Sequence, residues 1–101
     1  MYESRMKTPQ TERLVRALLC LEDGGECYQL LEDLCTVREI RDLAQRLEVA
    51  QLLKKGVTYS EIVEKTGVST ATIGRVNRSL LYGAGGYPLV LERLSREDER
   101  G

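Results

Sequence analysis

The sequence contains no His, no Trp and no Phe among its 101 residues. His is the side chain that most often serves as a general base or a zinc ligand, so we expect neither a Ser-His nucleophile pair nor most kinds of zinc site. We therefore predict that the protein is not an enzyme and holds no metal ion. Five Tyr are its only aromatic residues, so Leu must supply most of the core, which favours helices over an aromatic-rich β-sandwich.

Other absences exclude further classes of protein. No run approaches the roughly 18 consecutive apolar residues of a membrane-spanning helix, and the polar first ten residues lack the apolar core of a signal sequence. The three cysteines are odd in number, which argues against a disulfide scaffold and favours a reducing cytoplasm. The formal net charge of −1 gives no overall attraction to nucleic acid, so any such binding must come from a local patch.

The first part of the chain predicts two short helices. Thr8-Pro9 carries the signals that begin a helix, and the apolar stripe from Leu14 to Leu21 is wider than one buried face of a small monomer needs. Gly24-Gly25 is expected to break this helix. A second helix over about residues 26–34 is then expected to bury Tyr28, Leu31 and Leu34.

A longer helix follows in the middle of the chain. Thr36-Val37-Arg38-Glu39 is a capping box, in which the Thr hydroxyl and the Glu carboxylate each accept a backbone N–H of the other residue. Apolar residues then recur with a period of 3.6 from Val37 to Leu53, and Gly56 ends the pattern. These signals predict a helix of roughly 20 residues, about 30 Å long.

Residues 58–81 predict a helix-turn-helix. A second capping box, Thr58 to Glu61, begins a short helix that ends at Thr66, and Gly67 can adopt the left-handed conformation that the turn requires. Ser69 can cap the next helix, expected from Thr70 to about Leu81. The inward residues of this second helix are predicted to be Ala71, Ile73 (or Val76) and Leu80.

The remaining residues predict one more element. Pro88 is expected to restart a short helix over residues 87–95, and the charged tail from Ser95 is expected to fray. We therefore predict a single helical domain over residues 1–101, in which residues 8–57 contain the first helices. Residues 58–81 form the helix-turn-helix and residues 87–95 the C-terminal helix.

The second helix of the helix-turn-helix has unusual chemistry. From Lys65 to Leu91 the chain has three basic residues (Lys65, Arg75 and Arg78) and no acidic one. Small hydroxyl side chains near the start of the helix can approach phosphates and base edges closely, helped by the positive end of the helix dipole. The pattern favours a major-groove recognition helix, with an ordinary helical hairpin that has a polar face as the alternative.

Residues 69–80, Ser-Thr-Ala-Thr-Ile-Gly-Arg-Val-Asn-Arg-Ser-Leu, resemble the DNA-reading helix of the bacterial tryptophan repressor family. The resemblance extends back through Thr36–Glu39 and Leu43–Leu53 to the family's long central helix. It implies an all-α fold of six helices and an intertwined homodimer. Residues 8–57, which contain the first three helices, would then form a dimerisation core in which both chains interlock. Each chain would present one helix-turn-helix to a pseudo-palindromic operator in double-stranded DNA.

The resemblance also assigns roles to individual residues of the helix-turn-helix. By position, three residues of its first helix would lie near the DNA backbone: Tyr59, Ser60 and Val63. Four residues of the second helix would face base edges, some through water: Ser69, Thr70, Ala71 and Gly74. Arg75 and Arg78 would supply the local positive charge that phosphates attract.

An amino-acid site is implied as well, in which two arginines sandwich the indole of the effector. Arg46 and Arg75 match those arginines, and three residues match their polar neighbours: Thr36, Thr72 and Ser79. The family has Gly directly after the recognition-helix arginine, whereas this chain has Val76, whose isopropyl group could close the indole slot. L-tryptophan, another small effector and no effector are therefore alternatives, and we expect no cofactor.

Two functions follow from these observations. The first is a cytoplasmic, sequence-specific transcription regulator, a repressor that binds its operator as a homodimer. The second is a helical adaptor for protein–protein interaction that kept the fold and lost DNA binding, which the net charge of −1 and Val76 favour.

Overall fold

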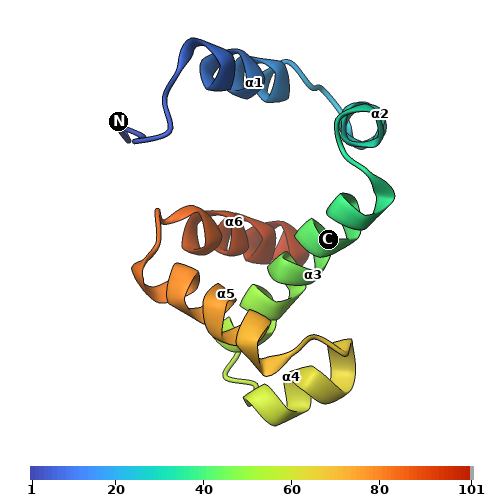
Figure 1. Cartoon of the computed structure of the whole chain (residues 1–101), viewed down its shortest axis with the longest axis vertical. Helices are drawn as coiled ribbons and strands as arrows, with labels where there is room; N and C mark the ends of the chain where they lie inside the picture. The colour runs from blue at the N-terminus through green and yellow to red at the C-terminus, as the bar shows by residue number, and fades with distance from the viewer. Residues whose placement is uncertain (101) are drawn as a thin grey trace. The chain divides into compact units, whose positions relative to one another are not determined.

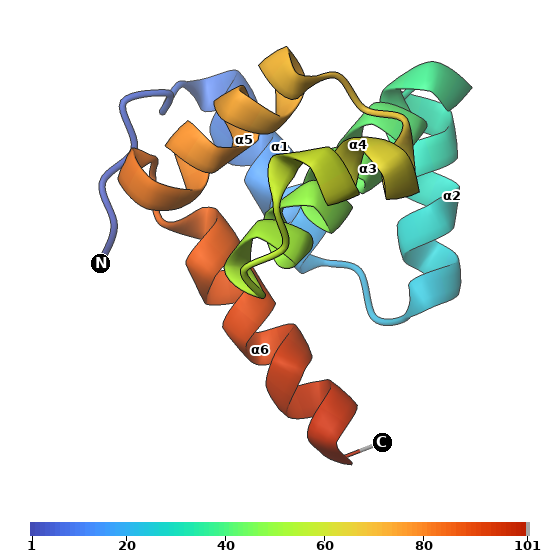
Figure 2. The same ribbon diagram turned by 90° about the horizontal axis from the view of Figure 1, so that it is seen from below.

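A computed structural model describes residues 1–100, and every regular element in this range is a helix (Figures 1 and 2). The expected all-α class is therefore confirmed. In chain order the helices are α1 (Pro9–Leu19), α2 (Gly24–Leu34), α3 (Val37–Lys54), α4 (Tyr59–Thr66), α5 (Thr70–Tyr82) and α6 (Gly86–Arg100). Among these described helices, none has the length and apolarity that crossing a lipid bilayer requires.

The chain divides into two compact units, Met1–Ile40 and the residues from Arg41 onward. The first unit contains α1, α2 and the start of α3, and the second contains the rest of α3 with α4, α5 and α6. The single domain expected from the sequence stays a prediction.

In the first unit, polar side chains cap both short helices. The Thr11 N–H donates to the Thr8 hydroxyl at 3.1 Å, and the Asp23 carboxylate accepts the Glu26 N–H at 2.9 Å. Asp23 thus begins α2 at Gly24, so the prediction that Gly24-Gly25 lies outside both helices is wrong. The first turn of a helix tolerates these glycines because its N–H groups have no intrahelical partners and the cap supplies one.

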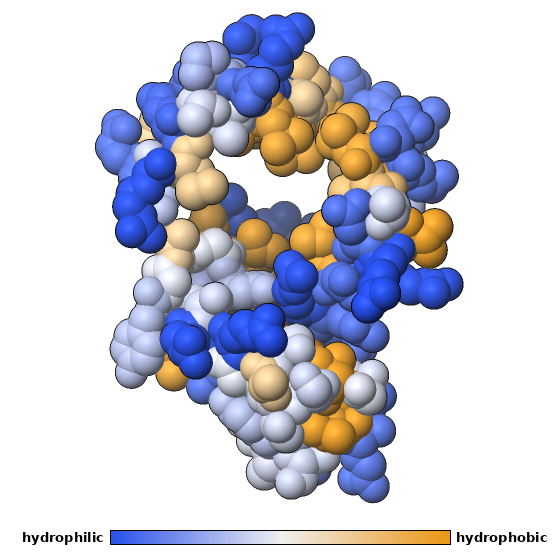
Figure 3. Space-filling view, in the orientation of Figure 1, coloured by the Kyte–Doolittle hydropathy of each residue, from blue (hydrophilic) through white to orange (hydrophobic). Residues whose placement is uncertain are grey.

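The apolar side chains of α1 and α2 are largely uncovered. No residue in either helix is fully buried, and apolar groups gather on their surfaces (Figure 3). Leu31 is half-buried, but Tyr28 and Leu34 are 67% and 56% exposed, so their predicted burial within the chain is wrong. The apolar pattern identifies a face of each helix, but it does not say which surface covers that face.

The start of α3 confirms the predicted capping box. The Glu39 N–H donates to the Thr36 hydroxyl at 3.1 Å, and the Thr36 N–H donates to the Glu39 carboxylate at 2.8 Å. The hydrogen bond that the carboxylate accepts from the Thr36 N–H favours the ionised form, so it holds the pKa of Glu39 below its usual value. The helix has 18 residues, and Gly56 follows it with a φ of +83°. Its expected end is therefore confirmed.

The second unit has a compact apolar core. It combines residues of α3, α4, the following turn, α5 and α6, which are Val49, Ala50, Ile62, Val68, Ile73, Val76 and Leu91. Helix α5 packs against both α4 and α6, and Ile73 and Val76 supply its inner face. Both alternatives predicted for that inner position are therefore buried.

The last helix is longer than the sequence suggested. It begins at Gly86 and continues to Arg100, so the prediction of a short helix over residues 87–95 and a frayed tail is wrong. Pro88 lies in the first turn, where its missing N–H removes no hydrogen bond. Arg96 Nε donates to Glu92 Oε1 at 2.8 Å, one turn apart, and such pairs stabilise the charged end of a helix.

Truncation of the central core residue of α5 tests this packing. Ile73 is fully buried, so Ile73→Ala should lower the free energy of unfolding by about 2–5 kcal/mol. Urea unfolding followed by circular dichroism measures the loss. Glu64→Ala, at an exposed position of α4, is the control and should change it by less than about 0.5 kcal/mol. Equal effects of the two substitutions would contradict the assigned core.

Candidate nucleic-acid interface

Helices α4 and α5 and the turn between them form a helix-turn-helix (Figure 1). The Glu61 N–H donates to the Thr58 hydroxyl at 3.3 Å, which caps α4. Gly67 ends α4 in the left-handed conformation, with a φ of +73°, and its N–H donates to the Val63 carbonyl. Val68 follows in the core at 7% exposure. The turn predicted from the sequence is therefore confirmed.

Thr66 holds this turn in a way that the sequence analysis missed. Its hydroxyl donates to the Ile62 carbonyl at 2.7 Å and accepts the Val68 N–H at 3.1 Å. The two hydrogen bonds link the last turn of α4 to the residue that enters the core. A hydroxyl residue directly before the turn glycine was the signal that could have indicated this role.

The outer face of α5 is open along its length. Because Ile73 and Val76 point into the core, the opposite face carries the exposed residues Thr70, Ala71, Arg75 and Arg78. The prediction that Ala71 faces inward is therefore wrong, whereas its position is compatible with the predicted contact with base edges. The helical period of 3.6 residues separates these two faces.

Ser69 already has a structural task at the start of α5. Its hydroxyl accepts the Thr72 N–H at 3.2 Å and donates to the Thr72 hydroxyl at 3.1 Å. Ser69 is nevertheless exposed, so it lies at the surface where the sequence predicts a DNA contact. Its side chain caps the helix and orients the exposed N-terminal turn.

The residues predicted on α4 differ in exposure. Tyr59 and Ser60 are exposed in the first turn of the helix, as a contact with the DNA backbone requires. Val63 is half-buried and packs against the core of the second unit. Most of the Val63 side chain therefore supports the packing of α4 rather than its outer surface.

Three basic side chains of the helix-turn-helix are exposed and free of ion pairs within the described residues. Lys65, Arg75 and Arg78 are exposed, and within residues 1–100 none of them has a carboxylate oxygen within 4.0 Å of its side-chain nitrogens. Their positive charges are therefore not neutralised by local ion pairs. Exposed cations of this kind are the groups that bind the phosphates of nucleic acid.

Gly74 lies in the interior of α5 on the outer side of the helix. It is half-buried, and its φ is not positive. Glycine in a helix interior costs about 1 kcal/mol relative to alanine. A Cβ atom on Gly74 would meet no heavy atom within 4 Å, apart from chain neighbours and the backbone of its own helix. The packing of the chain therefore does not require glycine at this position.

Three of the predicted effector residues line one surface hollow of about 260 Å³. Arg46, Thr72 and Arg75 share it with Val68 and Ser69, and Asp42 and Gln45 of α3 complete it. The sequence analysis missed Asp42, although its position one turn before Arg46 places both residues on one face of α3. Val68 is the one apolar residue of this lining.

The other residues predicted at that site have different surroundings. Thr36 caps α3 in the first unit, and Ser79 lines a separate hollow with Leu47, Tyr87 and Val90. Val76 is 4% exposed and belongs to the core rather than to the lining of the hollow between Arg46 and Arg75. The structure thus brings together both predicted arginines and one of their three polar neighbours.

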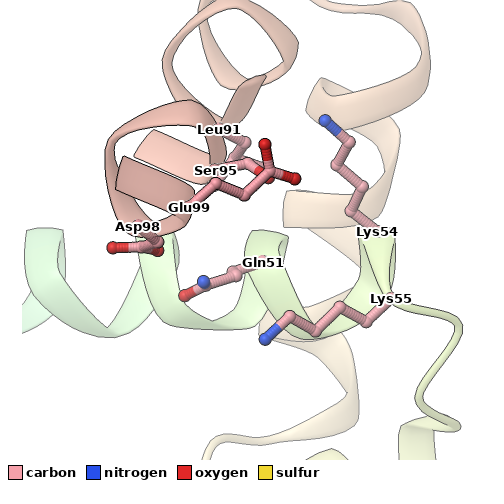
Figure 4. A pocket seen from close by; sticks show the side chains of 7 residues that line it. All are labelled: Gln51, Lys54, Lys55, Leu91, Ser95, Asp98 and Glu99. Atoms are coloured by element: carbon pink, nitrogen blue, oxygen red, sulfur yellow. The ribbon is translucent and has the colours of Figure 1, made fainter. Parts of the chain in front are cut away.

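A further hollow of about 450 Å³ lies between the end of α3 and α6 (Figure 4). Lys54 and Lys55 line it from one side, and Asp98 and Glu99 line it from α6. No residue of α4 or α5 contributes to its lining. This hollow is therefore separate from the exposed face of the helix-turn-helix.

Comparison with known proteins identifies the family to which the chain belongs. The family described as "Trp repressor protein" matches residues 9–95. The chain is 45% identical over 94 residues to YerC of Bacillus subtilis (strain 168), described as an uncharacterized protein, covering 93% of this chain and 90% of YerC. It is 54% identical to a TrpR-like protein from Eubacterium eligens ATCC 27750, a solved structure, with a TM-score of 0.86. That match covers 90% of this chain and 94% of the other chain. The protein therefore belongs to the Trp repressor family.

Proposed function

We propose that the protein is a transcriptional repressor that binds a specific operator in double-stranded DNA through its helix-turn-helix. The observation that carries the proposal is the outer face of α5, where small exposed residues stand beside Arg75 and Arg78 and neither arginine has an ion-pair partner among residues 1–100. Membership of the Trp repressor family supports it, because helix-turn-helix DNA binding is the activity of that family. A repressor of this kind works in the cytoplasm, where bacterial DNA lies.

The two kinds of residue on this face have separate tasks in the proposal. Arg75 and Arg78 bind phosphates, which contributes affinity that depends on salt but not on sequence. Thr70 and Ala71 contact base edges in the major groove, because their short side chains let the helix approach closely. Ser69 orients the first turn of α5 by capping it.

Dimerisation is the second part of the proposal. Three apolar residues of α1 are 44–52% exposed: Leu14, Val15 and Leu18. Helical spacing places Leu14 and Leu18 one turn apart, so they lie on one face of the helix. Tyr28 and Leu34 of α2 are exposed as well. Apolar surface of this extent on a small protein marks an interface, and a second copy of the chain would cover it. Two recognition helices held about 34 Å apart would reach successive major grooves of a pseudo-palindrome.

The proposed division of tasks on α5 predicts different effects of two substitutions. Arg78→Ala should weaken binding to all DNA sequences and reduce the slope of log Kd against log salt by roughly 2 for the dimer, because one phosphate contact is lost in each half-site. Thr70→Val should change the sequence preference, because the hydroxyl is lost and the shape is kept. Fluorescence anisotropy on operator and random DNA measures both effects.

Arg93→Ala, at an exposed position of α6, is the matched charge control and should leave both quantities unchanged. The operator itself is obtained by selection from a random DNA pool. If Thr70→Val, like Arg78→Ala, weakened binding to operator and random DNA by equal factors, the proposed division of tasks would be contradicted. If the wild-type protein binds no DNA at high micromolar concentration and low salt, the protein is an adaptor rather than a repressor.

The dimer predicts a strong effect of one charge in α1. Leu18→Glu would place a carboxylate in the apolar interface, so the protein should change from a dimer to a monomer at micromolar concentration. Light scattering coupled to size-exclusion chromatography measures the mass. Gln10→Glu, at an exposed position at the start of the same helix, should remain dimeric. A wild-type monomer under these conditions would refute the proposed assembly.

We further propose that operator binding requires no small effector. An indole binds in a pocket lined mainly by apolar groups, and the hollow between Arg46 and Arg75 has Val68 as its one apolar residue. The two arginines are available to contact an anion, but an aromatic ring would find little apolar surface beside them.

This proposal is tested by adding L-tryptophan to the binding assay. At about 1 mM, a concentration that half-saturates a site with a binding free energy of only about −4 kcal/mol, it should change the Kd for the operator less than about threefold. Glycine at the same concentration is the control for a nonspecific effect. A tenfold or greater tightening by L-tryptophan alone, lost in Arg46→Ala, would show that the hollow is an effector site.

A further inference from the structure

We propose that Gly74 is a specificity-determining residue, at which the bare backbone of α5 admits the 5-methyl group of a thymine on the floor of the major groove. The inference rests on the DNA binding proposed above and adds the chemistry that this position reads. Its basis is that glycine, the least favourable residue except proline in a helix interior, stands at a position where nothing within the chain requires it.

The other described glycines of the second unit have structural explanations. Gly83 has no room for a side chain, because a Cβ atom there would lie 2.3 Å from the Ser79 carbonyl oxygen. Gly86 begins α6, where the cost to a helix is small. The remaining three have a positive φ, which favours glycine: Gly56, Gly67 and Gly85.

None of these three explanations applies to Gly74, which lies in the interior of α5. Its φ is not positive, and space for a Cβ atom is open on the side facing away from the core. An alanine would therefore fit the isolated chain and strengthen α5. The absence of a side chain is consequently useful only for something outside the chain that approaches the helix backbone closely.

The neighbours of Gly74 indicate what approaches. Thr70 and Ala71 lie one turn earlier on the same side of α5, and both are exposed. Their methyl groups are the kind that contacts the 5-methyl group of thymine in the major groove. Arg78 lies one turn later, so a cation that can bind phosphate borders the gap. The open space where Gly74 lacks a Cβ atom therefore has apolar groups on one side and can receive a methyl group.

The test measures the DNA affinity of Gly74→Ala and of the wild-type protein. One DNA is the selected operator. In each of the others, one thymine is replaced by deoxyuridine at the same position of both half-sites. At one thymine the wild type should lose about fourfold in affinity per half-site, as expected for one buried methyl group. Gly74→Ala should bind the unmodified operator at least tenfold more weakly and be indifferent to that replacement.

Thermal unfolding at fixed protein concentration separates this role from a structural one. Gly74→Ala should raise Tm by about 2–8 °C, because alanine strengthens the helix. Ser95→Ala, an exposed helix-strengthening substitution in α6, is the matched control and should raise Tm without changing DNA affinity. A stabilised protein with impaired DNA binding is the expected result.

Each other outcome has a defined meaning. If the wild type binds the operator and Gly74→Ala binds it within twofold, or if Gly74→Ala lowers Tm, the inference is overturned and the proposed function stands. Wild-type indifference to every deoxyuridine replacement likewise overturns it. If the wild type selects no DNA sequence at all, the proposed function fails, and this inference fails with it.

Discussion

The orientation of α5 depends on the apolar contact between its inner face and the core of the second unit. Ile73 and Val76 are buried against residues contributed by α3, α4 and α6, so α5 cannot rotate about its axis without exposing them. Fixing the inner face also fixes the outer one, because successive residues of a helix are separated by about 100°. The polar face is therefore presented in one orientation, as shape-complementary contact with a DNA groove requires.

Charge is distributed locally in a chain that is nearly neutral overall. The segment from Lys65 to Leu91 has no acidic residue, whereas a short segment beside and within α2 has five: Glu22, Asp23, Glu26, Glu32 and Asp33. At physiological salt, exposed charges interact over only about 8 Å, so the local excess of positive charge matters more for DNA binding than the net charge of −1. This removes the main objection to DNA binding that composition raised.

The two units differ in what they leave uncovered. The first exposes apolar faces on α1 and α2, and the second has its own core and exposes polar and basic groups on α5. In the proposed dimer the first unit supplies the interface and the second supplies the DNA contacts. Arg46 of α3 and Arg75 of α5 line one hollow, but this hollow lacks the apolar lining that an aromatic effector needs. Family membership therefore supports the fold more strongly than it supports regulation by tryptophan.

Local signals in the sequence determined where α3 and α5 begin and how the turn between α4 and α5 is formed. The capping residues Thr36 and Ser69 and the left-handed Gly67 act within a few residues of the chain, so their roles could be inferred without a fold. Only the tertiary structure decided which apolar faces are covered. It showed Tyr28 and Leu34 exposed and Ala71 on the outer face of α5, and it placed Asp42 beside the arginine pair. Periodicity tells which residues share a face, but burial depends on what packs against that face, and this is set by contacts between distant segments.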